Sequence, residues 1–141
     1  MTGDAMRTAG LILLLAVASN SAMAEWDKVS AGDDGLQTSY VDRGSIKKES
    51  HIVTMWSLVD FKNAQKIEES ASPMSYKSVA KQFDYDCRQN QYRMTAFNYY
   101  LDNLGEGAIV IGDSHLSRSD WEKVAPHSIE EGLWKIACGK N

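Results

Sequence analysis

The two cysteines, Cys87 and Cys138, are the residues whose chemistry the sequence constrains best. Neither belongs to a Cys-x-x-Cys motif or has a histidine within a few positions, so the spacing of a zinc site is missing. A catalytic thiol would need a neighbouring base, and only Arg88 stands beside Cys87 to lower its pKa. Two thiols of a small domain in an oxidising compartment usually pair. We therefore predict a structural Cys87–Cys138 disulfide.

Histidines, serines and carboxylates would supply the chemistry of an envelope hydrolase or a metal-dependent enzyme. Ser114 and His115 follow Asp113, which gives the three residue types of a hydrolase triad, but adjacent residues do not normally converge in triad geometry. We interpret this segment as a polar loop. An enzyme would need distant residues to converge, and the candidates are His51, His115, His127, Ser114, Ser117, Asp33, Asp34, Asp84, Asp86 and Asp113.

Asp84 and Asp86 lie two positions apart, at the spacing that puts both side chains on one face of a strand. Such a pair could hold a hard cation, but Ca²⁺ takes six or more oxygen ligands and no DxDxDG loop is present. A solvated face explains the pair better. No glycine-rich loop that could cradle a phosphate is present either. We expect no catalytic residue, no metal and no cofactor.

The aromatic residues could form a platform for sugars or peptides, because amphipathic rings suit surfaces that are partly apolar and partly wet. Alternation along residues 91–101 sends Phe97 and Tyr99 to one side and Tyr100 to the other. We expect most rings, Tyr92 included, to pack in the core. A partner would bind the sheet face that the helix leaves uncovered, or a free sheet edge.

The first 24 residues have the pattern of a secretory signal peptide. Arg7 precedes the apolar run Ala9 to Ala18, and small residues follow as Ala22-Met23-Ala24. The apolar run of about ten residues is short of the roughly 20 that span a bilayer. Glu25 follows the expected cut, so no cysteine signals lipid attachment. We predict an exported chain, periplasmic or secreted, with no membrane anchor in its mature form.

Residues 25–141 have the length of one domain. The formal net charge is −4, and no cluster of lysine or arginine could follow a phosphate backbone, so nucleic acid is excluded as an expected partner. No repeat or low-complexity segment suggests a linker. We predict a single domain after the signal peptide.

Most of the mature chain alternates with period two, which predicts half-buried strands. We expect strands at 36–42, 51–61, 75–87, 91–101 and 108–112, with a turn at Arg43-Gly-Ser45 and a hairpin loop at 102–107. In the strand ending at Cys87, alternation directs Phe83 and Tyr85 to the core and Asp84 and Asp86 to water.

The spacing of the apolar residues changes after Pro126, from alternation to the spacing of a helix. Ser128 begins a capping box, apolar residues at 129, 133 and 136 recur at helical spacing, and Gly139 supplies a stop. Residues 129, 133 and 136 form an aliphatic stripe, and Cys138 and Trp134 fall on a different side of the helix from it. Either the helix ends before Cys138, or both of its sides are covered. If Trp134 faces the sheet, the stripe is left for a loop or another subunit, which is one reason to suspect a homodimer. A helix this short must dock. The predicted class is α+β: an antiparallel sheet with a C-terminal helix packed on one face and tethered by the disulfide.

The order of these features resembles the surface-adhesin protein E family of small exported bacterial domains. The matching residues cover almost the whole mature chain: Trp26, Tyr40-Val-Asp42, Ser45-Ile46, Trp56, Asp60, Ser75, Lys77, Phe83-Asp-Tyr-Asp-Cys87, Tyr99 or Tyr100, Gly105-x-Gly107, Trp121-x-x-Val124-x-Pro126 and Cys138. The resemblance implies about six antiparallel strands with a disulfide-held C-terminal helix. It also implies binding of host extracellular-matrix components, although the missing lipid-attachment cysteine departs from the adhesin.

Two hypotheses follow. The first is a non-catalytic exported module that binds a protein or peptide through a sheet face or edge, alone or as an accessory subunit of an envelope assembly. The second is a hydrolase or metal-dependent enzyme. A cleft that gathers two of His51, His115, His127, Asp84 and Asp113 within hydrogen-bond reach would favour the enzyme, whereas scattered, exposed positions would oppose it.

Overall fold

The computed structural model describes residues 24–32, 34–68, 72–116 and 120–141. Nearly all of the predicted signal peptide, together with Asp33 and Ser117 among the candidate enzyme residues, lies outside the described residues. No helix among the described residues is long and apolar enough to cross a membrane.

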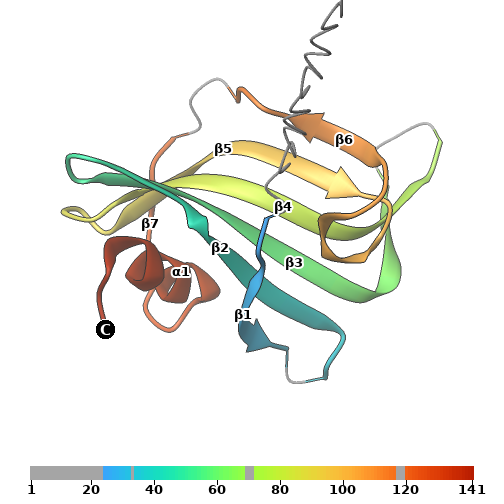
Figure 1. Cartoon of the computed structure of the whole chain (residues 1–141), viewed down its shortest axis with the longest axis horizontal. Coiled ribbons are helices and arrows are strands. Elements are labelled where there is room, and N and C mark those ends of the chain that lie inside the picture. Colours follow the sequence, from blue (N-terminus) through green and yellow to red (C-terminus); the bar gives the residue numbers. More distant parts are fainter. Residues whose placement is uncertain (1–23, 33, 69–71, 117–119) are drawn as a thin grey trace, which may run out of the picture.

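The described chain forms a curved antiparallel sheet with one helix (Figure 1). Six strands lie in the sheet in sequence order, so each of these six pairs with the strands that precede and follow it along the chain. Their bounds are β1 Asp27–Ala31, β2 Gln37–Glu49, β3 Ile52–Ile67, β4 Met74–Asp86, β5 Gln91–Tyr100 and β6 Ile109–Asp113. A two-residue strand, β7 Glu122–Lys123, pairs with the beginning of β5. The predicted α+β class is confirmed.

The strand β2 continues past the turn predicted at Arg43-Gly-Ser45, and that prediction was wrong. The residues form a bulge instead, since the pairing of β2 with β3 shifts register between Asp42 and Lys47. The Asp42 carboxylate accepts the amide of Gly44 at 3.0 Å, and the Ser45 hydroxyl accepts the amide of Trp56 at 2.9 Å. These bonds satisfy the backbone within the strand. The chain reverses after Glu49, where Ser50 has a left-handed φ of 57°.

The helix α1, Ile129–Cys138, begins and ends at the predicted signals. The Ser128 hydroxyl accepts the Glu131 amide at 3.1 Å, and Gly139 adopts the left-handed conformation of a C-cap. Cys138 belongs to the helix. Leu133, Trp134 and Ala137 are buried, and Ile136 is half-buried, so both sides of the helix are covered to different degrees.

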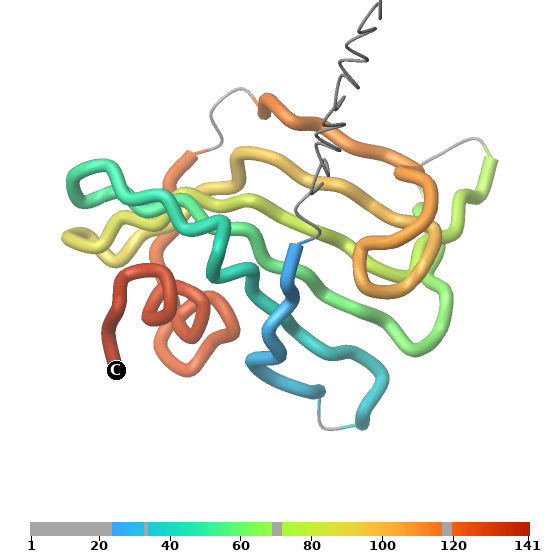
Figure 2. The backbone as a smooth tube through the Cα atoms, viewed as in Figure 1, coloured from blue at the N-terminus to red at the C-terminus, as the bar shows by residue number. Residues whose placement is uncertain are grey.

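The two faces of the sheet are covered by different parts of the chain. Figure 2 shows the β2–β3 and β4–β5 turns projecting from the same end of the sheet, which is the end that α1 covers. Val53, Met55 and Tyr85 are at most 1 % exposed and pack there beneath the helix. On the opposite face, the segment 102–107, with the 3₁₀ turn η1 Asn103–Gly105, covers the buried Leu58 and Ser78.

Candidate binding surfaces

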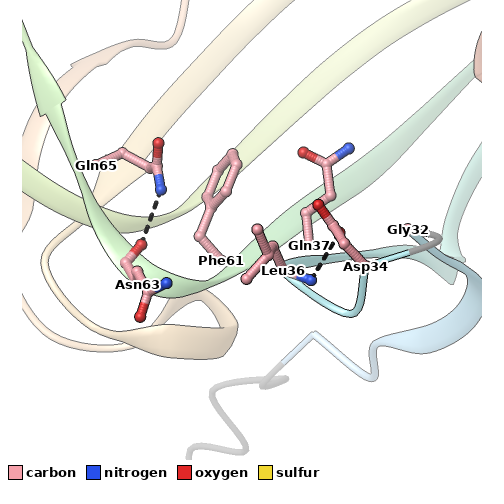
Figure 3. A pocket seen from close by; sticks show the side chains of 7 residues that line it. All are labelled: Gly32, Asp34, Leu36, Gln37, Phe61, Asn63 and Gln65. Carbon is pink, nitrogen blue, oxygen red and sulfur yellow. Dashed lines mark hydrogen bonds between the residues drawn. The ribbon is translucent and has the colours of Figure 1, made fainter.

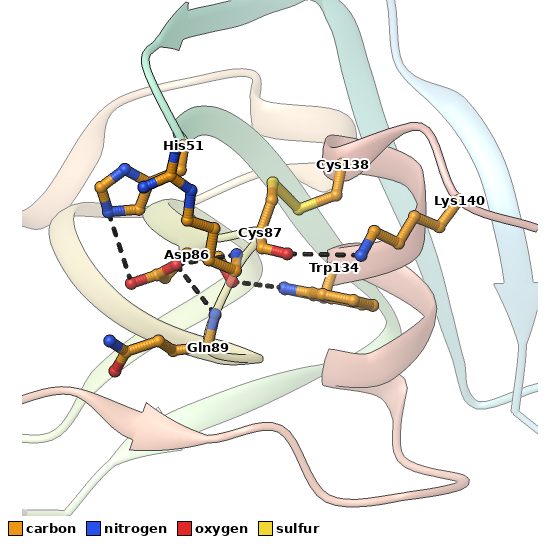
Figure 4. Close-up of a disulfide and its surroundings, with 8 residues drawn as sticks. His51, Asp86, Cys87, Gln89, Trp134, Cys138 and Lys140 are labelled. Carbon is orange, nitrogen blue, oxygen red and sulfur yellow. Dashed lines mark hydrogen bonds and ion pairs between the residues drawn. A yellow bond between two sulfur atoms is a disulfide. The ribbon is translucent and has the colours of Figure 1, made fainter.

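The disulfide joins α1 to the end of β4, as predicted (Figure 4). The Cys87 and Cys138 Cα atoms are 5.6 Å apart and 51 positions apart along the chain. Beside it, the indole Nε1 of Trp134 donates a buried hydrogen bond of 2.9 Å to the Asp86 carbonyl. The Lys140 ammonium donates to the Cys87 carbonyl at 3.3 Å and lies 4.7 Å from the Trp134 ring centroid. The helix is therefore held by apolar contact, a hydrogen bond and a covalent tether.

The two aspartates beside the disulfide do not form the solvated face that alternation predicts. Asp86 is 7 % exposed, and its carboxylate accepts the amides of Arg88 at 2.9 Å and Gln89 at 3.0 Å, which closes the β4–β5 turn. Asp84 is half-buried and accepts a hydrogen bond of 2.7 Å from Thr54 on β3. The prediction was wrong because short acidic side chains at a strand end can satisfy turn amides.

A cross-strand ion pair completes the environment of Asp84. The guanidinium Nε of Arg93 on β5 donates to the Asp84 carboxylate at 3.1 Å, and the same guanidinium lies 4.3 Å from the centroid of the Trp121 ring. This places a cation, a carboxylate and an indole in one fixed row on the face opposite α1. The acidic pair is thus committed to contacts within the protein.

The candidate enzyme residues in the described part of the chain do not converge on one site. The Ser114 hydroxyl and His115 Nδ1 are 2.9 Å apart, but the Asp113 carboxylate accepts the backbone amide of His115 at 2.9 Å instead of its imidazole. All three residues are exposed. A triad needs the acid on the imidazole and a cleft around the serine. This segment therefore has the polar-loop role that the sequence predicts.

The other two histidines, His51 and His127, lie away from the segment that contains Ser114 and His115. His51 Nε2 lies 3.9 Å from the Asp86 carboxylate, which already binds two turn amides. His127 is exposed, has a left-handed φ of 61°, and precedes the helix cap. Among the described residues, no group of three or more histidine, cysteine or acidic side chains is arranged to hold a metal ion.

A row of aromatic rings crosses the helix-bearing face at the end that α1 does not reach. The rings of this aromatic row belong to Phe61, Tyr76, Tyr99 and Phe97, and consecutive centroids are 5.9, 4.7 and 5.7 Å apart at nearly perpendicular angles. All four side chains are half-buried. Burial raises the pKa of Tyr76, and the neighbouring Tyr99 raises it further. The aromatic row is an ordered apolar surface with hydroxyl groups that can hydrogen-bond a partner.

An open pocket of about 540 Å³ lies at the Phe61 end of the aromatic row. Figure 3 shows the Phe61 ring standing between Gln65 and the Leu36 side chain, at the bulged part of β3. The remaining lining residues are polar, namely Asp34, Gln37 and Asn63, together with Gly32. Leu36 is 46 % exposed. Apolar side chains beside a few polar groups are the usual composition of a ligand-binding site.

The opposite face carries a second pocket of about 550 Å³, which we call the Trp26 pocket. The rings of Trp26, Tyr40 and Tyr100 line it, with Ala24, Leu104, Gly105 and Glu106. Tyr40 comes from β2 and Tyr100 from the end of β5, so the pocket spans the middle of the sheet. This face is the one that α1 leaves uncovered, which is one of the two places where the sequence predicts a partner to bind.

A network of buried polar groups fixes the wall of the Trp26 pocket. The Ser78 hydroxyl, on a fully buried residue, donates to the Asp102 carbonyl at 2.7 Å and accepts the Gly105 amide at 2.9 Å. The Asp60 carboxylate accepts the Leu104 amide at 2.8 Å. Leu104 is 42 % exposed and has a left-handed φ of 55°. The loop is thus held from below while it presents a strained apolar residue.

A third, smaller groove of about 290 Å³ lies between β1 and α1. Its apolar lining includes Val29, Ile129, Leu133 and Ile136, and Ile129 is 51 % exposed. Ile129, Leu133 and Ile136 form the aliphatic stripe for which the sequence left a loop or another subunit open. In the described chain β1 borders part of the stripe. The homodimer remains a prediction.

Two tyrosines, the buried Tyr85 and the half-buried Tyr92, lie in the sheet beneath the N-terminal end of α1. Burial raises the pKa of Tyr85, the Glu130 carboxylate and Tyr92 raise it further, and the nearby Ser57 hydroxyl lowers it only in part. Burial, followed by a hydrogen bond to the Glu122 carboxylate, raises the pKa of Tyr92 to about 12. Both phenols therefore stay neutral at ordinary pH.

A family model described as surface-adhesin protein E matches residues 26–139, which is nearly all of the described chain. The chain belongs to the surface-adhesin protein E family. Membership confirms the resemblance seen in the sequence and supports an adhesin-like module. No curated protein matches the chain.

Solved structures of protein E from Haemophilus influenzae share the fold of this family member. One has a TM-score of 0.57 at 14 % identity and covers 79 % of this chain and 83 % of its own. A second crystal form has a TM-score of 0.55 at 16 % identity, covering 72 % of this chain and 80 % of its own. Protein E from a non-typeable strain has a TM-score of 0.53 at 15 % identity, and the match covers 82 % of this chain and 84 % of its own. At these identities the similarity shows the fold alone.

Sequence reasoning missed two members of the aromatic row. Phe61 lies near the end of the predicted strand 51–61, and Tyr76 lies near the start of the next predicted strand. In an antiparallel hairpin, the end of one strand and the start of the next lie at the same end of the sheet. This relation could have placed both rings beside Tyr99. The contribution of Trp26 to a pocket could not be found this way, since Trp26 precedes β1.

Proposed function

We propose that this protein is a non-catalytic, exported binding module that recognises a protein or peptide partner through an exposed face or edge of its sheet. The aromatic row is the observation that carries this proposal. Four rings from three strands form one continuous half-exposed surface, while α1 covers only the other end of the same face. Aromatic residues that remain accessible on a rigid sheet are typical anchors of protein interfaces.

Family membership supports recognition over catalysis, because the family is one of surface adhesins. A host extracellular-matrix component is therefore one candidate partner, and a protein of the cell envelope is another. Residues 1–24 would act as the signal peptide and residues 25–141 as the mature domain, located in the periplasm or released. The outer edges of β1 and β6, the first and last strands of the six-strand order, add backbone groups that could accept a further strand.

Site-specific photo-cross-linking tests the proposal. Benzoylphenylalanine replaces Tyr99 in the middle of the aromatic row, or Lys48 as a matched control at an exposed position near the β2–β3 turn. We expect a discrete adduct from position 99 and none from position 48. The adduct's partner is then purified, and its affinity for the Tyr99→Ala variant should fall at least about tenfold, as for an interface anchor. Adducts of equal yield at both positions, or unchanged affinity of Tyr99→Ala, would overturn the proposal.

A further inference from the structure

We propose that the Trp26 pocket binds a proline-rich segment of a partner polypeptide in the polyproline II conformation. This inference rests on the proposed binding function and adds a second site with a defined ligand class. The site lies on the face opposite the aromatic row. Side chains along β2 and β5 alternate between the two faces of the sheet, and Tyr40 and Tyr100 stand at positions that face away from α1 and from the aromatic row.

The rings of the pocket supply the apolar contacts that such a segment needs. Trp26, Tyr40 and Tyr100 belong to the mature domain and line a pocket of about 550 Å³, whose remaining wall includes Ala24 at the end of the proposed signal peptide. Each of the three is half-buried, so each keeps part of its ring accessible. Leu104 adds an exposed aliphatic side chain at the rim. Proline rings pack well against aromatic faces, and aromatic-lined grooves are the usual receptors for proline-rich chains.

The polar atoms of the pocket are unused hydrogen-bond donors. Within the part of the chain that the structure describes, Trp26 Nε1 and the Tyr40 hydroxyl have no hydrogen-bond partner. The Tyr100 hydroxyl accepts from the Asn98 amide at 3.4 Å, which leaves its own proton free to donate. A ligand that brings hydrogen-bond acceptors and apolar surface together would therefore match this pocket.

A polyproline II segment has that combination. It makes no internal hydrogen bonds, so its carbonyl groups are free acceptors, and proline adds no amide donor that would need a partner. An added β-strand fits less well. It needs an open backbone edge, whereas the pocket is walled by side chains of β2 and β5, which both have neighbours on either side in the sheet.

The pocket wall is organised before any ligand binds. Asp60 and the fully buried Ser78 fix the loop that carries Leu104 in its left-handed conformation. Little ordering entropy then remains to be lost on binding. Glu106 adds a carboxylate at the rim of a chain with a net charge of −4. A basic residue next to the prolines would complement this charge.

The probe for this site is an acetylated peptide of one arginine followed by nine prolines. The readout is the indole N–H resonance of Trp26 in the ¹⁵N-labelled chain, assigned by its loss in Trp26→Phe. We expect a saturable shift of this resonance. Tyr40→Phe removes one donor while it keeps the ring, and should weaken binding about fivefold. Tyr92→Phe, at the end of the sheet beneath α1, also removes one hydroxyl and lies in neither binding surface, so it is the matched control and should leave the affinity unchanged.

Three results would overturn the site: no shift of the Trp26 resonance, an equal shift with a glycine-serine peptide of the same length, or an equal effect of Tyr40→Phe and Tyr92→Phe. Cross-linking through position 99 separates this failure from that of the proposed function. If the proline peptide fails while the Tyr99 adduct persists, the Trp26 site is wrong and the binding function stands. If both fail, the binding function is wrong as well.

Discussion

Removal of the disulfide should destabilise the protein strongly without undocking α1. The Cys87→Ala/Cys138→Ala double variant opens a loop closed over 51 positions, and the chain-entropy relation gives a loss of about 4 kcal/mol in the free energy of unfolding. That is a large share of the 5–15 kcal/mol typical of a domain. The helix should stay in place because Leu133 and Trp134 remain buried and the indole keeps its bond to the Asp86 carbonyl.

Urea unfolding of the oxidised chain and of the double variant measures this difference, and near-ultraviolet circular dichroism reports whether Trp134 keeps its packed environment. The matched control is Trp134→Phe with the disulfide intact, which loses the indole donor to the Asp86 carbonyl and should cost about 2 kcal/mol. If the double variant lost less than about 1 kcal/mol in unfolding free energy, the disulfide would not stabilise the protein by restricting its unfolded chain. Loss of the Trp134 signal under native conditions would refute independent docking of the helix.

Three further predictions concern single side chains. Ser78→Ala should cost about 2 to 3 kcal/mol and speed hydrogen exchange of the Gly105 amide, because a buried donor and acceptor lose their partner; an unchanged exchange rate would contradict this. Ser128→Ala should lower the unfolding free energy by about 1 kcal/mol in urea titrations through loss of the helix cap, and an equal stability would show that the cap is dispensable. The stabilisation from neutral Tyr92, whose pKa is raised from 10.0 to about 12, is complete below pH 10 and is lost as the pH rises to about 12. Tyr92→Phe should therefore flatten the alkaline decline in stability, and an unchanged decline would contradict the shift.

The elements of the fold could be predicted where one physical signal dominates. Period-two alternation locates the long central strands, because one face of each is buried. The helix is located by a cap at Ser128 and a stop at Gly139. The disulfide follows from the absence of any other use for the two cysteines. Each of these signals is local or is a count, so it can be read without knowledge of packing.

Other features of the fold depend on tertiary contacts. Gly44 stands in a sequence that is typical of a turn, yet the partner strand β3 keeps β2 extended through a bulge. Asp86 lies in an alternating run, yet the turn that follows it supplies amides for its carboxylate. The short strands β1 and β7 lack an alternating pattern long enough to detect. In each case the deciding partner is remote in sequence or lies outside the repeating pattern.

The candidate surfaces were only partly predictable for the same reason. Alternation separates Tyr99 from Tyr100 and so assigns them to opposite faces, which the structure confirms. It does not show how far α1 extends over one face, and this extent decides whether Tyr99 is covered. The Trp26 pocket needs the N-terminal segment and the loop at 102–107 to meet over Leu58, which no local pattern encodes.

Hydrogen–deuterium exchange of the chain with and without its purified partner tests recognition through the aromatic row most directly. We predict slower exchange in the parts of β4 and β5 that flank Tyr76 and Tyr99, with no change at the Ser50–His51 turn. Protection confined to that turn, or no protection at a saturating concentration of partner, would contradict recognition through the aromatic row.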